Sequence, residues 1–337
     1  MLQQFFALGK KYWKYIKVFF FGLLCLWLFS LLKHDWVKLS SFAWEPKWGW
    51  LLISTLLYVF SFLPAAIFWR FALGYLGQKK SLAATLYAYY LGLLGKYVPG
   101  KAAVVVIRAG TVSSSPKEVT FATVSVFYET LTMMGTGAFL AALLLGLKNQ
   151  QNFSLTILSF GCAMLALVPL LPPIFTRLLK VLKVVKNQEN VDLSSFTFKR
   201  LLSGCLLMCP VWLLLGLSLW SLICGIGVAT PPLTTNLLDY VMVVALSMTL
   251  GFVIIISPGG IGVREFVLTT FLTPLFIQFL ELPENAKFTL EPETIAALVA
   301  ISQRILTIVA EVIMAFSLIF LRKIIFPMIQ KFKNARL

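Results

Sequence analysis

The sequence predicts an all-α integral membrane protein, a polytopic helical bundle, from two observations. Hydrophobic residues make up 59% of the 337 residues and charged residues only 12%, whereas a soluble domain has about 25% charged residues. Apolar runs of roughly the 20 residues that a helix needs to cross the hydrocarbon core recur along the chain. No long polar stretch separates these runs, so we expect a single polytopic membrane domain over 1–337.

Six apolar runs are expected to be full spans, at 18–32 (extended towards the N-terminus), 50–71, 119–147, 153–171, 201–228 and 294–321. The first run follows four lysines, as the apolar part of a signal peptide would. No small-residue cleavage site comes after it, so we expect a retained anchor.

Two other apolar regions are interrupted by proline and glycine, at GKYVPGK (95–101) and at SPGGIGVRE (257–265). Basic loops face the cytoplasm, which puts both ends of the first region inside and both ends of the second outside. The apolar pieces beside the first break are too short for two clean crossings. We therefore expect the first region, about 81–115, to be a re-entrant broken hairpin from the cytoplasm. The second region, about 233–280, must be a pair of crossings or a hairpin from outside; we expect a hairpin, because two broken hairpins from opposite faces are typical of an inverted-repeat transporter.

Positive charge also sets the orientation of the chain. The N-terminus, the loop around Lys79, the segment 177–200 and the tail are basic, so we expect both termini in the cytoplasm, at the bacterial cytoplasmic (inner) membrane. Between about 174 and 188 a cation recurs every third residue among leucines and valines, which predicts an amphipathic helix on the anionic cytoplasmic leaflet. A solvated connecting helix is the alternative. The expected interfacial lipid contacts are Arg177, Lys180, Lys183 and Lys186.

The two breaks supply the predicted binding site. Irregular backbone and charge at membrane depth are tolerated only inside protein or beside a water-filled cavity. A helix that begins after a glycine-rich turn points backbone amides at the gap, and an arginine there can bind phosphate through two parallel hydrogen bonds. The alternative is that the cations snorkel to an interface and the Pro-Gly steps are ordinary turns. We predict one midplane cationic site for an anionic lipid head group, formed by Lys96, Pro99, Gly100, Lys101, Arg108, Pro258, Gly259, Gly260, Gly262 and Arg264.

Four more charges lie within the apolar runs and are predicted to gate the site or balance its charge: Glu129, Glu265, Arg304 and Glu311. Arg304 and Glu311 are seven residues apart on one helical face, so each should pair across to another helix. Glu129 and Glu265 are natural partners. Structural ion pairs and a role in substrate or proton movement both remain open. We expect no metal site, cofactor or catalytic residue, because one histidine (His34) and five scattered cysteines cannot build a metal cluster or a triad.

These residues carry a family resemblance. GKYVPGK with Arg108, SPGGIGVRE, and Arg304 with Glu311 resemble the lysylphosphatidylglycerol synthase transmembrane region family, over about residues 10–325. The resemblance implies a flippase-like membrane domain that moves or binds phospholipid-type or polyprenyl-phosphate lipids. In bifunctional members, a soluble domain that transfers lysine from aminoacyl-tRNA follows this region. This chain ends soon after its last span, so we expect no synthase activity. Lys101 departs from the commoner family form, which has Gly-Asp before the arginine.

The predicted function is transbilayer transport, of flippase or scramblase type, of an anionic phospholipid or polyprenyl-phosphate lipid, without enzymatic activity. No Walker A loop is present, so a gradient or downhill flow would drive the movement. The expected partners are anionic membrane lipids and a separate lipid-modifying enzyme; nucleic acid is not expected, because the basic residues flank apolar runs. Two alternatives stay open. One is a lipid-binding scaffold subunit of a membrane glycosyltransferase or lipid synthase. The other is an intramembrane lipid-phosphate transferase, which would need a general base or metal ligands.

Overall fold

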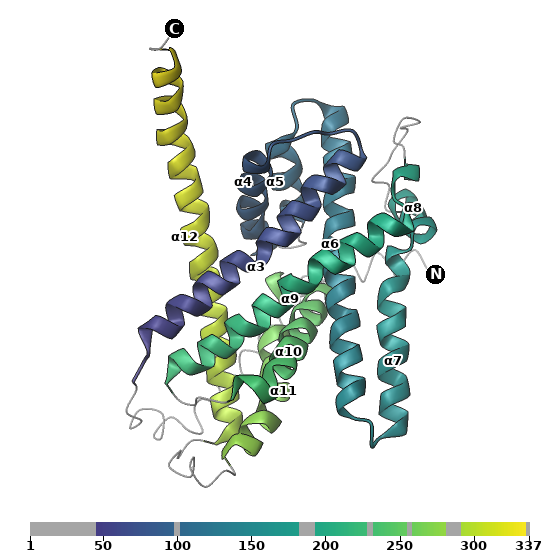
Figure 1. Cartoon of the computed structure of the whole chain (residues 1–337), viewed down its shortest axis with the longest axis vertical. Helices are drawn as coiled ribbons and strands as arrows, with labels where there is room; N and C mark the ends of the chain where they lie inside the picture. The colour runs from purple at the N-terminus through teal and green to yellow at the C-terminus, as the bar shows by residue number, and fades with distance from the viewer. Residues whose placement is uncertain are drawn as a thin grey trace, which may run out of the picture. The chain divides into compact units, whose positions relative to one another are not determined.

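The computed structural model describes residues 45–97, 102–181, 193–227, 232–254, 258–280 and 291–334. Every regular element within these ranges is a helix (Figure 1), so the all-α prediction is confirmed. The first predicted span, 18–32, lies outside the described residues.

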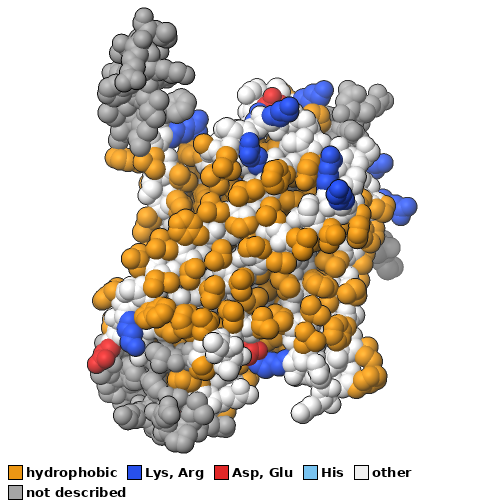
Figure 2. Space-filling model, viewed as in Figure 1, with side chains coloured by type: hydrophobic (Ala, Val, Ile, Leu, Met, Phe, Trp, Pro, Cys, Tyr) orange, Lys and Arg blue, Asp and Glu red, His pale blue; other side chains and the backbone are white. Residues whose placement is uncertain are grey.

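Six helices of the described residues are long and apolar enough to cross a membrane. Five of them correspond to predicted full spans, and the sixth, α10, was expected to belong to the second hairpin. Hydrophobic side chains are spread over the face that Figure 2 shows. Many large hydrophobic side chains of the described residues are exposed, for example Phe153 at 77% and Phe316 at 67%. Such a surface suits contact with lipid tails rather than water. The six are α3 (Trp48–Tyr75), α6 (Pro116–Lys148), α7 (Phe153–Leu167) with the short 3-10 helix η2 (Val168–Leu170), α9 (Phe198–Ile226), α10 (Leu233–Val253) and α12 (Pro292–Asn334).

Both regions predicted as hairpins form pairs of packed helices. In the first, α4 (Leu82–Leu93) and the 3-10 helix η1 (Leu94–Tyr97) precede α5 (Ala102–Val112), which packs against both. With 12 and 11 residues, α4 and α5 are each less than about 20 Å long and too short to cross the hydrocarbon core. In the second, α10 packs against α11 (Val263–Leu280) across the 3-10 helix η4 (Pro258–Gly260). Re-entry of either pair from one membrane face stays a prediction.

The described chain divides into two compact units, each of which contains one of the helix pairs. The α10–α11 unit comprises described residues within 45–57, 137–166 and 212–304; the α4–α5 unit comprises those within 58–136, 167–211 and 305–334. Each unit therefore holds one helix pair together with one segment of each of α3, α6, α9 and α12. These shared elements are consistent with a chain built from two repeats, although α7 belongs to one unit and α8 (Pro172–Val181) to the other.

Small residues allow the long helices to approach one another in the α10–α11 unit. The Ser54 hydroxyl donates to the Ser218 carbonyl at 2.7 Å, and the Ser218 hydroxyl donates to the Ser54 carbonyl at 2.8 Å, which ties α3 to α9. A Cβ atom at Gly137 in α6 would lie 2.2 Å from the ring of Trp212. Glycine and serine contacts of this kind are typical of packing between membrane helices.

An aromatic cluster anchors α8 (Pro172–Val181) to the α4–α5 unit. Phe175 of α8 packs against Tyr128 and Phe196, with ring centroids 5.2 and 5.3 Å apart. The apolar side of α8, with Phe175 and Leu179 fully buried, therefore packs on protein, whereas Arg177 and Lys180 are exposed. The rest of the amphipathic helix predicted at about 174–188, with Lys183 and Lys186, lies outside the described residues.

Candidate functional site

The turn between α10 and α11 is built around glycine. Gly259, Gly260 and Gly262 have φ values of 60°, 74° and 84°, a left-handed backbone that only glycine adopts without strain. Gly262 immediately precedes α11, and its N–H donates to the carboxylate of Glu265, three residues later. This is the glutamate half of a capping box. The sequence Gly-x-x-Glu thus both makes the sharp turn and satisfies the start of the following helix.

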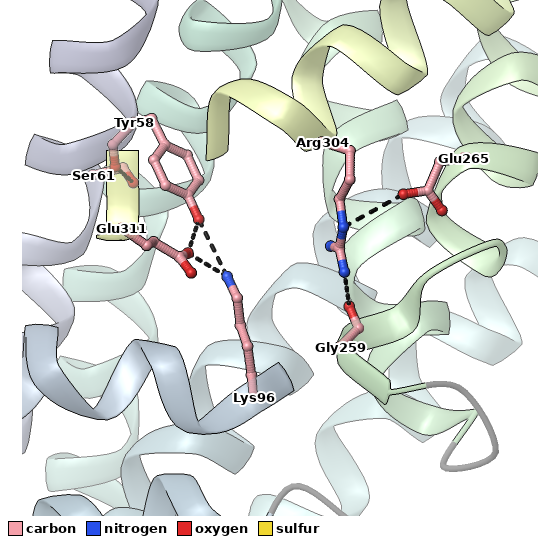
Figure 3. Close-up of polar contacts among 7 residues, drawn as sticks. All are labelled: Tyr58, Ser61, Lys96, Gly259, Glu265, Arg304 and Glu311. Atoms are coloured by element: carbon pink, nitrogen blue, oxygen red, sulfur yellow. Dashed lines mark hydrogen bonds and ion pairs between the residues drawn. The ribbon is translucent and has the colours of Figure 1, made fainter. Parts of the chain in front are cut away.

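Arg304 of α12 joins this turn. Its Nη2 donates to the Gly259 carbonyl at 3.2 Å, and its Nε lies 3.6 Å from Glu265 Oε1 (Figure 3). Both side chains are largely buried. The expectation that Arg304 pairs across to another helix, with Glu265 as a natural partner, is confirmed.

Arg264 lies in a slot between two glycines. A Cβ atom at Gly251 in α10 would be 2.8 Å from Arg264 Cγ and 3.0 Å from Nε, and one at Gly260 would be 2.9 Å from Nε. The Arg264 side chain therefore packs directly against the backbone of both glycines, which restricts its conformation. The sequence analysis included Gly260 but missed Gly251. The sequence feature that could have identified Gly251 is that it is a lone glycine within an apolar helix, two turns before Pro258. A glycine in such a place usually allows another group to pack closely against the helix.

The turn cluster, defined as Arg264, Glu265 and Arg304, carries more positive than negative charge. It contains two guanidinium groups and one carboxylate, beside the N-terminal end of α11. The helix dipole places further partial positive charge at that end. The cluster is thus electrostatically suited to an additional anionic group.

The α4–α5 unit holds a different arrangement around Arg108. Arg108 is 4% exposed; its Nη1 donates to Glu129 Oε2 at 2.6 Å, and the Tyr89 hydroxyl donates to Glu129 Oε1 at 2.9 Å. The guanidinium carbon also lies 3.7 Å from the centre of the Tyr89 ring. A Cβ atom at Gly92 would be 2.5 Å from Arg108 Cγ, so a glycine again makes room for an arginine. This geometry is that of an internal ion pair.

A second buried pair in the same unit joins Lys96 to Glu311. The Lys96 ammonium and the Tyr58 hydroxyl both donate to Glu311 Oε1, and Lys96 Nζ lies 3.3 Å from the Tyr58 oxygen (Figure 3). Glu311 is 3% exposed, and the Lys96 side chain is the more open of the pair, at 15%. Glu311 thus pairs across to another element, as expected of it.

The structure places most of the predicted site residues within these clusters. Pro258 lies in η4, whereas Pro99, Gly100 and Lys101 fall outside the described residues. Tyr58 and Tyr89 were missed by the sequence analysis; their signal was a tyrosine within an apolar helix, where the hydroxyl needs a partner. That the two breaks face one common site stays a prediction.

A model of the lysylphosphatidylglycerol synthase TM region matches residues 15–278 of the chain. The chain belongs to this family. As a lysylphosphatidylglycerol synthase TM region protein, it is an integral membrane protein of a lipid-related family. The match includes the first helix pair and the second up to residue 278, and it ends before α12, which carries Arg304 and Glu311. No curated protein matches the chain.

Proposed function

We propose that this protein moves an anionic lipid, a phospholipid or a polyprenyl phosphate, across the bacterial cytoplasmic membrane, with both termini in the cytoplasm. The observation that carries the proposal is that the turn cluster brings two arginine side chains and a helix N-terminus to one glycine turn inside an apolar helical protein. Each arginine at the membrane centre costs about 2.5–3.5 kcal/mol on insertion scales. Guanidinium groups and helix N-termini are the groups that bind anions in proteins, and their presence together at this turn supports an anionic ligand.

Phosphate is the anion that fits this cluster best. A guanidinium group presents parallel N–H donors that match two phosphate oxygens. Packing against Gly251 and Gly260 restricts the conformation of the Arg264 side chain. The glycine turn has no side chains to keep a head group away from the backbone. The acyl or prenyl chains would remain among the lipid tails beside the exposed apolar helices.

In the α4–α5 unit, Lys96 is the proposed head-group contact, with Lys101 and Gly100 of the same break beside it in sequence. We assign Arg108 to a structural role within this proposal, because Glu129 and Tyr89 enclose it. Glu129 and Glu265 have both carboxylate oxygens engaged. Neither of these two carboxylates is therefore available as the general base that an intramembrane transferase would need.

Reconstitution tests the proposal. Purified protein in vesicles with a fluorescent anionic lipid in one leaflet should equilibrate that lipid between leaflets, and Arg264→Ala should slow the movement. A hydrogen bond to a charged group contributes about 1.5–3 kcal/mol, which corresponds to roughly a tenfold to hundredfold loss. Arg70→Ala, at an exposed arginine of α3, is the matched control and should move lipid like the wild type.

The outcomes separate the remaining alternatives. Equal rates with and without protein would refute transport, and co-purification with a lipid-modifying enzyme would then favour a scaffold subunit. Equal rates for wild type and Arg264→Ala would keep transport but remove the turn cluster from it.

A further inference from the structure

Three threonines of the α10–α11 pair bond to their own helix. The Oγ1 atoms of Thr249, Thr270 and Thr273 donate to the backbone carbonyl four residues earlier, at 2.7, 2.8 and 2.7 Å. Threonine in a helix has two favoured side-chain positions, because its hydroxyl can turn back to the helix in this way. Such a bond satisfies the hydroxyl locally, so the side chain needs no partner from another element.

Thr269 of α11 behaves differently. Its side chain is 1% exposed, and its Oγ1 is buried without a hydrogen-bond partner among the residues that the structure describes. The carbonyl of Glu265, four residues earlier, therefore does not accept from it. Burial of a hydroxyl without a partner is unfavourable, so a group that accepts a hydrogen bond from Thr269 would lower the free energy of the protein. A buried polar group of this kind usually marks a bound water or a functional contact.

Thr269 lies beside the turn cluster. It follows Glu265 by four residues, and residues four apart lie on one face of a helix, about 6 Å apart along its axis. The Cα–Cβ bonds of a helix tilt towards its N-terminus, so the Thr269 side chain leans towards the start of α11, where the turn cluster lies. Phe266 and Thr270 are exposed and mark a different side of this helix. Thr269 thus points into the α10–α11 unit.

The interior face of α11 becomes apolar beyond Thr269. Leu272 and Phe276 follow on this face and are buried, and the hydroxyl of Thr273 is bonded within the helix. A polar group that enters from the glycine turn therefore meets Glu265 first and Thr269 one turn later. Past that point the helix offers apolar contacts.

A lipid phosphate is a suitable partner for this hydroxyl. The guanidinium group of Arg264 can bind two phosphate oxygens in parallel, and a phosphate group has further acceptor oxygens. An ionised carboxylate cannot donate to them, so on this face of α11 the donor comes from Thr269 and not from Glu265. Thr269 breaks no side-chain hydrogen bond within the described protein when it donates.

We propose that Thr269 is a lipid-binding residue of the α10–α11 unit, whose hydroxyl donates a hydrogen bond to the phosphate of an anionic lipid held at the turn cluster. This rests on the proposed function and adds a head-group contact to it. The unsatisfied hydroxyl destabilises the empty protein, and the lipid compensates for it. Removal of the hydroxyl should therefore stabilise the empty protein and weaken lipid binding, a combination that a purely structural role would not produce.

The test compares Thr269→Val, which keeps the shape of the side chain and removes the hydroxyl, with Thr270→Val at the next residue. Thr270 is exposed and bonded to its own helix, so its variant is the matched control. In vesicles with fluorescent phosphatidylglycerol, Thr269→Val should move the lipid about tenfold more slowly than the wild type, because a hydrogen bond to a charged group is lost. Thr270→Val should move it like the wild type. Without added lipid, the thermal unfolding midpoint of Thr269→Val should shift to higher temperature.

Binding supplies a second measurement. Water-soluble short-chain phosphatidylglycerol, added to the purified protein in detergent, should raise the thermal unfolding midpoint of the wild type. Thr269→Val should need about tenfold more of this lipid for the same shift. If the wild type moves no lipid in vesicles, the proposed function fails, and this titration still decides whether Thr269 contacts the head group.

Equal lipid movement by the wild type and Thr269→Val would overturn the assignment while leaving lipid transport intact. Equal titrations of the two proteins, or no shift in the wild type, would also overturn it. A lower unfolding midpoint of Thr269→Val would show that the hydroxyl is already satisfied, as by a buried water, and would refute the proposal. Should Thr269→Val not fold, Thr269→Ser and Thr269→Ala take its place. Both lose the methyl group and only serine keeps the hydroxyl, so serine alone should retain lipid movement; an equal loss in both would refute the contact.

Discussion

Substitution of Gly251 by alanine should disturb Arg264 without removing any functional group. The new Cβ would lie 2.8 Å from Arg264 Cγ and 3.0 Å from Nε, whereas carbon atoms make favourable contacts at about 3.5–4.0 Å. The arginine stem must therefore shift by roughly 0.7 Å or more. A shift at Cγ grows towards the guanidinium end, and loss of one charge-assisted hydrogen bond costs about 1.5–3 kcal/mol. We expect at least about a tenfold slower movement of anionic lipid.

The fold should survive this change. Alanine is favoured over glycine in a helix interior by about 1 kcal/mol, which offsets part of the overpacking cost of about 1–3 kcal/mol. The assay is the vesicle experiment with fluorescent anionic lipid, together with thermal unfolding of the purified protein. Gly161→Ala in α7 is the matched control, because a Cβ there meets no atom within 4 Å.

A double-mutant cycle shows whether Gly251→Ala slows lipid movement through Arg264 or through helix packing. In an Arg264→Ala background the clash is gone, so Gly251→Ala should cost nothing further; non-additivity of this kind is expected for residues in contact. An equal loss in both backgrounds would show that Gly251 acts through helix packing. Wild-type movement by the single variant would refute the glycine slot as a positioning device.

Three further predictions concern stability. Arg108→Met should leave the buried Glu129 without its cationic partner, and loss of one partner of a buried pair costs about 3–5 kcal/mol; an unchanged unfolding midpoint in denaturant would argue against this pair. Gly137→Ala, whose Cβ would lie 2.2 Å from Trp212, should destabilise by about 1–3 kcal/mol through overpacking and change the tryptophan fluorescence; an unaltered spectrum would contradict the contact. Phe175→Ala should cost about 3–5 kcal/mol and increase proteolysis within α8, whereas unchanged proteolysis would indicate that α8 is held by lipid.

Composition and helix-breaking residues were enough to predict the elements. A hydrophobic content of 59% fixed the class, and the proline and glycine steps marked the joints of both helix pairs, because these residues interrupt helices by their own backbone chemistry. The spacing of Arg304 and Glu311 likewise indicated that both reach other elements. These are local properties, and a sequence displays them directly.

Partners across space were harder to predict. Helical spacing gives the face on which Glu311 lies, but nothing in it selects Lys96 or Tyr58 as its neighbours. The periodicity of α8 predicts an apolar side, yet Phe175 packs on protein where a lipid surface was expected to cover the helix. Gly251 has no side chain, and its role becomes visible only beside Arg264.

The pairing of an arginine with a glycine on the preceding helix has a consequence for sequence variation in this family. Gly92 faces Arg108, and Gly251 faces Arg264, each at a distance that leaves no room for a methyl group. Relatives that keep the arginine should therefore keep glycine at the facing position, whereas relatives that have replaced the arginine by a small residue should be free to accept alanine or serine there. The two positions of each pair are thus expected to covary. A relative that has the arginine but a larger residue in place of the glycine would have to hold the arginine side chain in a different position.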